Sequence, residues 1–194
     1  MKNYILFILS LLLFGCVTSE TETSSEQEIT TSSLEFACNF NIEHSDNYTK
    51  LSILSPWELN KVLNTYYLVK NDSVAVPTDG VKIKVPVERI AVNSCSHVAY
   101  IDALSQVGKI VASTDPEFVY NENFRNLLAE GLIENLGGAY DMNFEKILKV
   151  NPQVLMITGF KGVDNMSLRA QEAGVSVVYN YEWVEKTVLG RAEW

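Results

Sequence analysis

The sequence predicts an α/β fold, in which a parallel sheet is covered by helices and a small antiparallel β unit precedes it. Two observations carry this prediction. Residues 34–86 alternate polar and apolar side chains in short stretches separated by turn signals, which is typical of antiparallel strands. From residue 87 onward, short apolar stretches alternate with stretches of helical spacing. Strands separated by helices pair in parallel, so residues 87–194 are expected to form one helix-covered sheet.

Four stretches of the first part are expected to be strands, and turn residues separate them. The stretches are Tyr48–Ile53, Thr65–Val69, Ser73–Val76 and Val81–Val85. The turn signals are Asn71-Asp72 and Thr78-Asp79-Gly80. Ser55-Pro56-Trp57 is expected to interrupt the unit as a loop.

The second part is expected to contain five strands and four helices. The strands are predicted at 89–93, 109–113, 132–136, 154–158 and 175–179, and the helices at 96–107, 123–130, 144–150 and 164–173. Asn143 is a suitable N-cap, and Pro152 prevents continuation of the helix that Asn143 begins. The spacing places Leu104 and Leu148 on the inward faces of their helices.

The N-terminus is typical of a secreted lipoprotein. Lys2 precedes an apolar run over residues 4–14, which is shorter than the about 17–25 residues that a membrane-spanning helix needs. The run therefore fits a signal peptide over residues 1–16. Leu13-Phe14-Gly15-Cys16 resembles a lipobox, although Phe14 stands where a small residue is usual. Cys16 is the predicted lipidation site, and the protein is expected in the cell envelope, anchored to a bacterial membrane.

Residues 17–33 are rich in Ser, Thr and Glu and are expected to be a flexible tether, because they have too little apolar surface to fold. The formal net charge of the whole chain is −9. Nucleic acids are bound through basic patches, so the acidic balance argues against a nucleic-acid partner.

A binding site is expected beyond the carboxyl ends of the parallel strands, which is where open α/β sheets bind ligands. Four predicted loops lie there. They offer the candidate ligand-binding residues Ser96, His97, Asp115, Tyr120, Phe160, Tyr181, Glu182 and Trp183. This mixture of aromatic rings, hydroxyls and carboxylates suits a large, partly apolar ligand. Each residue also has a structural interpretation: helix capping for Ser94 or Ser96, a surface or capping role for His97, a turn for Asp115, and packing for the aromatic residues.

The cysteines and histidines do not predict a metal site. Cys38, Cys95, His44 and His97 show no close ligand spacing. An oxidising compartment permits a disulfide between Cys38 and Cys95, but the sequence leaves open whether they pair or remain two buried thiols.

Three segments carry a resemblance to the solute-binding proteins of ABC importers for ferric siderophores, haem and cobalamin. They are Val85–Ile101, Asn143–Gly159, and Tyr179–Trp183 continuing to Leu189-Gly190-Arg191-Ala192-Glu193-Trp194. The resemblance implies two α/β lobes with the ligand between them, and transfer of the ligand to a permease and ATPase complex without chemistry. It also implies a monomer without a cofactor of its own, since iron or cobalt arrives only within the transported complex.

One role of the family transfers to a single residue. In relatives, a glutamate near the start of the helix before the buried strand pairs with permease arginines, and the matching position here is Glu145. A carboxylate bonds arginine through charge-assisted hydrogen bonds, so the role is chemically sound. The alternative is that Glu145 stabilises its own helix N-terminus.

The resemblance places Gly190–Trp194 at the start of the helix that joins the two lobes. Residues 87–194 are therefore expected to form the N-terminal lobe of such a protein, and the second lobe is expected to be absent from this chain. One lobe presents half of a binding surface, and weak or no ligand binding is therefore expected of this chain. Three other functions stay open. They are a scavenging or interaction lipoprotein without a permease, an extracytoplasmic enzyme using Ser94-Cys95-Ser96-His97, and a metal-binding relative.

Overall fold

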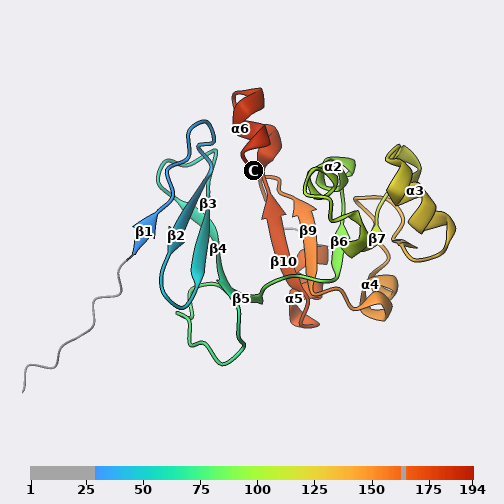
Figure 1. Cartoon of the computed structure of the whole chain (residues 1–194), viewed down its shortest axis with the longest axis horizontal. Helices are drawn as coiled ribbons and strands as arrows, with labels where there is room; N and C mark the ends of the chain where they lie inside the picture. The colour runs from blue at the N-terminus through green and yellow to red at the C-terminus, as the bar shows by residue number, and fades with distance from the viewer. Residues whose placement is uncertain (1–28, 163–164) are drawn as a thin grey trace, which may run out of the picture.

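The computed structural model describes residues 29–162 and 165–194, and the predicted signal peptide, Cys16 and most of the predicted tether lie outside them. Two five-stranded sheets lie side by side, and the second is covered by helices (Figure 1). Within the described residues, no helix is long and apolar enough to cross a bilayer.

The first sheet, here called the β unit, has the order β1-β2-β3-β4-β5. Its strands are β1 (Thr30–Thr31), β2 (Phe40–His44), β3 (Thr49–Leu54), β4 (Val62–Val69) and β5 (Val81–Lys84). The first four pair antiparallel, which fits the predicted kind of unit although β1 and β2 were not among the predicted strands, but β5 runs parallel to β4. The prediction of a wholly antiparallel unit is therefore wrong at its last strand.

Two local details of the β unit also differ from the prediction. Ser73–Val76 is not a strand but part of the connection that returns the chain to the middle of β4, where Val81 pairs with Tyr66. Lys82 Nζ reaches back into this connection and donates to the carbonyl of Val74 at 2.7 Å. Thr30–Thr31, within the expected tether, pairs with the end of β2 and adds an edge strand.

The second sheet is wholly parallel and confirms the predicted fold class. Its strands are β6 (Ile90–Val92), β7 (Ile110–Ser113), β8 (Glu134–Asn135), β9 (Val154–Thr158) and β10 (Ser176–Asn180), in the order β10-β9-β6-β7-β8. The helices between them are α2 (Cys95–Ala103), α3 (Glu122–Ala129), α4 (Phe144–Val150) and α5 (Asn165–Glu172), and α6 (Val188–Ala192) follows β10.

Local signals explain where these helices begin and end. Asn143 caps α4 as predicted, because its Oδ1 accepts the backbone N–H of Lys146 at 3.1 Å. Helix α2 is shorter than predicted, because Ser105 adopts a left-handed φ of 56° and ends the helical path. Leu104 and Leu148 were predicted to face inward, and both are exposed.

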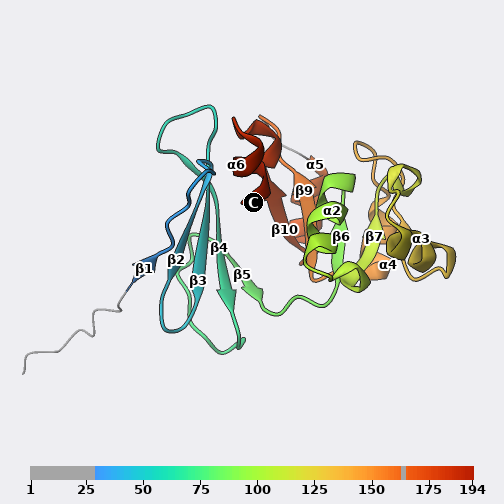
Figure 2. The same cartoon turned by 45° about the horizontal axis from the view of Figure 1, so that its top comes forward.

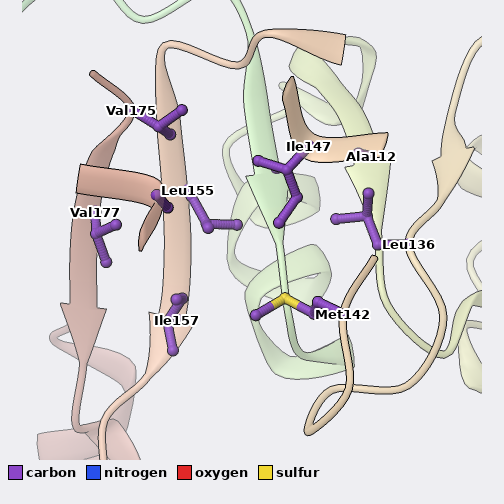
Figure 3. Close-up of a cluster of buried hydrophobic side chains, with 10 residues drawn as sticks. Ala112, Leu136, Met142, Ile147, Leu155, Ile157, Val175 and Val177 are labelled. Carbon is purple, nitrogen blue, oxygen red and sulfur yellow. The ribbon is translucent and has the colours of Figure 1, made fainter. Parts of the chain in front are cut away.

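Three packed layers result, because successive residues of each strand point to opposite faces of the sheet. On one face, α4 and α5 cover a core that includes Ile147, Leu155 and Val177 (Figure 3). On the other face, α2 and α3 cover the half around Val92 and Ile110, and the β unit covers the half at β9 and β10. The β unit is thus the second cover of the parallel sheet.

Two glutamates of the C-terminal segment fix the β unit to the sheet. The carboxylate of Glu193 accepts the backbone N–H groups of Glu35, Phe36 and Ala37 at 2.6–2.8 Å. The carboxylate of Glu185, which is only 5% exposed, accepts the backbone N–H groups of Cys38 and Asn39. It also accepts the indole N–H of Trp194 at 3.0 Å. We call these contacts the carboxylate clamp.

Candidate functional site

The strand order creates a switch point between β6 and β9. From β6 the chain proceeds to β7 and β8 on one side, and then returns to β9 on the other side. The connections that leave β6 and β9 therefore diverge, which opens a crevice at the carboxyl ends of these two neighbouring strands. Asn93 fixes their spacing, because its Oδ1 accepts the backbone N–H of Thr158 at 2.8 Å and its own N–H donates to Met156.

A hollow of about 460 Å³ lies at this point, and we call it the switch-point hollow. Its lining combines apolar core side chains with polar groups from the strand ends. The lining residues are Asn93, Ser94, Ala139, Tyr140, Met142, Ile157, Thr158, Phe160, Lys161, Gly162, Met166 and Tyr179. Binding sites for small molecules commonly have such a mainly apolar wall with a few polar groups.

Three aromatic rings form a continuous row beside the hollow. The centroid of Phe160 lies 6.4 Å from that of Tyr140 and 5.5 Å from that of Trp183, with the planes inclined by 36° and 37°. Tyr140 is 92% exposed, Phe160 50% and Trp183 38%. Exposed rings held in a row offer a stacking surface to a flat or aromatic ligand.

The row is held in place by the backbone at the end of β9. The indole N–H of Trp183 donates to the carbonyl of Gly159 at 2.9 Å. Glycine is the only residue type that fits at position 159, since a Cβ at this position would lie 2.1 Å from Cζ of Tyr181. Tyr181 therefore fills the space beneath Gly159, and Phe160 is turned toward the hollow's rim.

Among the predicted site residues, Phe160 and Trp183 lie at the hollow or its aromatic row. Ser96 lies close to the hollow through its neighbour Ser94. The two hydroxyl oxygens are 2.9 Å apart, and Ser94 caps α2 by accepting the backbone N–H of Ser96. The capping interpretation is thus confirmed for Ser94, which also lines the hollow.

His97 and Tyr181 are placed in the core rather than on the site surface. His97 is 1% exposed, and its ring donates to the carbonyl of Met156, while its Nδ1 has no partner among the described residues. Burial lowers the pKa of His97 to about 4, so the ring is neutral near neutral pH. Tyr181 is 5% exposed and packs in the core between the β unit and the sheet. Neither side chain has the exposed surface that a ligand contact needs, because each is covered by tertiary packing that the sequence pattern does not reveal.

The remaining predicted residues do not line the hollow. Asp115 braces the loop after β8, because its Oδ2 accepts the backbone N–H of Ala139 at 2.9 Å. Tyr120 is 82% exposed and does not line the hollow. Glu182 is half-buried in the turn after β10, where its backbone N–H donates to Asn180.

Of the residues that line the hollow, only Phe160 belonged to the predicted set, and Tyr140 and Asn93 are two that were missed. Tyr140 follows β8, and its loop was left out although it lies at the same carboxyl edge of the sheet. Asn93 directly follows β6. A polar side chain at the end of a buried strand was the sequence feature that could have predicted its place at the hollow.

The nucleophile arrangement that an enzyme would need is not formed by Ser94, Ser96 and His97. The two hydroxyls bond to each other, and the histidine bonds to a backbone carbonyl. Cys38 and Cys95 are both exposed free thiols, which answers the open question of their pairing. No group of three potential metal ligands occurs within residues 29–162 and 165–194.

Glu145 lies exposed in the first turn of α4. The two lysines nearest in sequence are occupied elsewhere: Lys146 and Lys149 approach Glu134 at 2.9 and 3.9 Å. Glu145 belongs to the helix that follows the loop of Tyr140. Its carboxylate is thus available to an external cation.

No family model matches the chain. Two curated relatives are uncharacterized lipoproteins of Methanocaldococcus jannaschii. MJ0878 is 27% identical over 94% of this chain, and MJ0872 is 26% identical over 97% of it. The alignments cover 52% and 54% of those proteins, so the chain spans about half the length of the curated relatives it matches.

The similar solved structures include binding proteins for haem and vitamin B12. The haem-binding protein HmuT is 23% identical, with a TM-score of 0.38 over 59% of this chain and 40% of its own. The vitamin B12-binding protein BtuF of Vibrio cholerae is 19% identical, with a TM-score of 0.37 over 48% of this chain and 34% of its own. TM-scores below 0.5 describe a partial likeness, so the site residues are assigned from this chain alone.

Proposed function

We propose that this chain is the ligand-binding lobe of an envelope lipoprotein that captures a ferric siderophore, haem or a corrinoid and delivers it to an ABC permease. The observation that carries the proposal is the switch-point hollow with its row of exposed aromatic rings. Rings inclined along one edge suit the flat or aromatic surface of such complexes, and the hydroxyl and amide groups of Ser94, Asn93 and Thr158 offer hydrogen bonds.

Attachment through lipid on Cys16 belongs to the same proposal. The sequence pattern around Cys16 and the two lipoprotein relatives support it. A lipid anchor holds a binding domain at the membrane surface where its permease lies. Replacement of Cys16 by Ser should release the protein from the membrane fraction, and retention of the variant there would contradict lipidation at this residue.

The test of the binding function is a titration of the chain with haemin, cyanocobalamin and a ferric tris-catecholate, followed by tryptophan fluorescence and amide chemical shifts. A single lobe offers half of a binding surface, so we expect a dissociation constant between about 1 mM and about 1 μM for one of the three. Shifts should gather at Tyr140, Phe160 and Trp183. A response to none of the three at millimolar concentration would refute the proposal.

A matched pair of variants tests the site itself. Phe160→Ala removes the middle ring of the row, and we expect about a fivefold loss of affinity, as stacking contacts of this size contribute about 1 kcal/mol. Phe118→Ala is the control, because Phe118 is also a largely exposed phenylalanine but does not line the hollow. Equal effects of the two changes would place the ligand elsewhere.

Delivery to a permease is assigned to Glu145, whose exposed carboxylate suits an arginine of the partner. Glu145→Arg should leave ligand affinity unchanged and abolish stimulation of the permease-coupled ATPase in vesicles. Unchanged stimulation would remove Glu145 from the interface. A chain that binds ligand but stimulates no permease would favour the scavenging alternative.

A further inference from the structure

Trp183, at one end of the aromatic row, lies in a turn that gives its ring little support. The turn is η3 (Glu182–Val184), a short 3-10 helix without a buried residue. Such turns have poorer hydrogen-bond geometry than an α-helix. The ring is 38% exposed, and its indole bond to the carbonyl of Gly159 anchors it at one point. The angle of 37° between the planes of Trp183 and Phe160 therefore also depends on what holds the backbone of the turn.

The side chain of Arg191 holds this backbone. Its Nη2 donates to the carbonyl of Trp183 at 3.0 Å, across eight residues of chain. A guanidinium presents its N–H groups in a rigid planar fork, so the bond restricts the carbonyl more than a flexible ammonium would. Two hydrogen bonds, one at the carbonyl and one at the indole nitrogen, thus fix the position of Trp183.

Helix α6, which carries Arg191, is itself fixed in place. It has only five residues, and a helix of this length is not stable alone. The hydroxyl of Thr187 caps it by accepting the N–H of Gly190 at 2.9 Å. The hydroxyl of Tyr100 in α2 donates to the carbonyl of Arg191 at 2.9 Å. Figure 2 shows α6 at the end of the molecule where β9 and β10 terminate. A continuous series of hydrogen bonds therefore leads from α2 through α6 to the aromatic row.

The bond between Arg191 and Trp183 lies at the surface. Arg191 is exposed, and within residues 29–162 and 165–194 its guanidinium bonds to this carbonyl and to no carboxylate. A contact between exposed groups contributes little to the stability of the fold. Its main effect is on where the exposed ring of Trp183 stands.

We propose that Arg191 is a positioning residue of the ligand site, which holds Trp183 in line with Phe160 and Tyr140 before a ligand arrives. Each side chain that must be immobilised on binding lowers affinity, so a row that is already ordered binds more tightly. Tyr100 supports the same arrangement from α2. The inference rests on the proposed function, because it assigns a role at the same aromatic row, but the position of the ring can be measured without a ligand.

The first measurement records the indole N–H signals of the ligand-free chain by heteronuclear NMR. The chain has three tryptophans, and Trp183→Phe identifies the signal of Trp183. We expect Arg191→Ala to move this signal and to speed the exchange of its proton with water, because the bond to Gly159 loosens. Tyr100→Phe, which removes only the hydroxyl, should move the signal in the same direction by a smaller amount.

The matched control is Arg125→Ala. Arg125 is also exposed and also donates to a backbone carbonyl, that of Val119 at 3.2 Å, but it belongs to α3. This change should leave the Trp183 signal in place, and both alanine variants should keep the urea midpoint of the unmodified chain. An unmoved Trp183 signal in Arg191→Ala, or an equal movement in Arg125→Ala, would overturn the positioning role. A midpoint that falls in Arg191→Ala alone would assign the residue to stability instead.

The second measurement titrates the same proteins with haemin, cyanocobalamin and a ferric tris-catecholate. For a probe that the unmodified chain binds, Arg191→Ala should lower affinity about two- to fivefold, the effect of one modest hydrogen bond, and Arg125→Ala should not. The loss should persist at high salt, whereas a direct ionic contact with the ligand would be screened. Unchanged affinity, or a loss that disappears at high salt, would overturn the inference and leave the proposed function standing. If the unmodified chain binds none of the three probes, the proposed function fails, and the indole signals alone decide whether Arg191 holds the ring.

Discussion

Glu185 of the carboxylate clamp provides the sharpest test of how the β unit is held. Its carboxylate accepts three N–H groups, from the backbone of Cys38 and Asn39 and from the indole of Trp194, at 3.0–3.2 Å. Hydrogen bonds to an ionised group contribute about 1.5–3 kcal/mol each, but bonds that share one acceptor do not add fully. We therefore expect Glu185→Ala to lower the free energy of unfolding by about 3–5 kcal/mol, since it leaves buried donors unpaired.

Equilibrium urea unfolding, followed by tryptophan fluorescence, measures this loss. The matched control is Glu182→Ala in the same turn, whose carboxylate accepts no hydrogen bond from the described residues. That change should cost less than about 0.5 kcal/mol. A loss below about 1 kcal/mol for Glu185→Ala would mean that water or local rearrangement replaces the clamp, and the reasoning from hydrogen-bond geometry would be refuted.

Three further predictions concern packing and pH. Gly159→Ala should destabilise the fold by about 2–3 kcal/mol or more, because the new Cβ would overlap the ring of Tyr181. Thermal unfolding measures this loss, and an unchanged melting temperature would contradict the close approach of Gly159 and Tyr181. The backbone N–H groups that Glu193 accepts lower the pKa of its carboxyl group from 4.5, so its contribution to stability is present above pH 4.5 and is lost as the pH falls through the lowered pKa. In urea unfolding at a series of pH values, Glu193→Gln should reduce the loss of stability at acid pH. An unchanged loss in the variant would exclude the clamp as its source. The pKa of His97 is about 4 in the folded protein and 6.5 in the unfolded chain, so the unfolded chain binds a proton more readily. The free energy of unfolding should therefore fall as the pH drops from 6.5 toward 4. A His97 ring that titrates near pH 6.5 by NMR would disprove its burial.

Elements governed by local signals could be predicted from the sequence. The Asn143 cap and Pro152 bracket α4, and the apolar stretch Val154–Thr158 is β9 as predicted. The parallel pairing of β5 could not be read in this way, because strand direction depends on the route of the whole connection and not on alternation. Ser73–Val76 alternates like a strand but finds no partner in the sheet.

The site shows the same division between local and tertiary information. The rule that ligands bind beyond the carboxyl ends of parallel strands correctly selected the loops of Phe160 and Trp183. The rule did not distinguish the exposed Phe160 from the buried Tyr181, because the burial of Tyr181 depends on the space left by Gly159 and on contact with Trp57 of the β unit. Tyr140 was missed because the loop after the predicted strand at 132–136 was not among the four loops selected.

The carboxylate clamp also determines how the molecule would respond to mechanical force. A protein tethered by its N-terminal segment is pulled from the chain before Thr30. Strand β1, with only two paired residues, would peel away first, and the pull would then reach residues 35–39. At residues 35–39, Glu193 and Glu185 would transmit the force to the C-terminal segment. This segment is bonded to α2, because the hydroxyl of Tyr100 donates to the carbonyl of Arg191. With the proposed anchor at Cys16, tension from the N-terminal segment would thus enter the parallel sheet's layer beside the aromatic row and would connect the anchor mechanically with the proposed site.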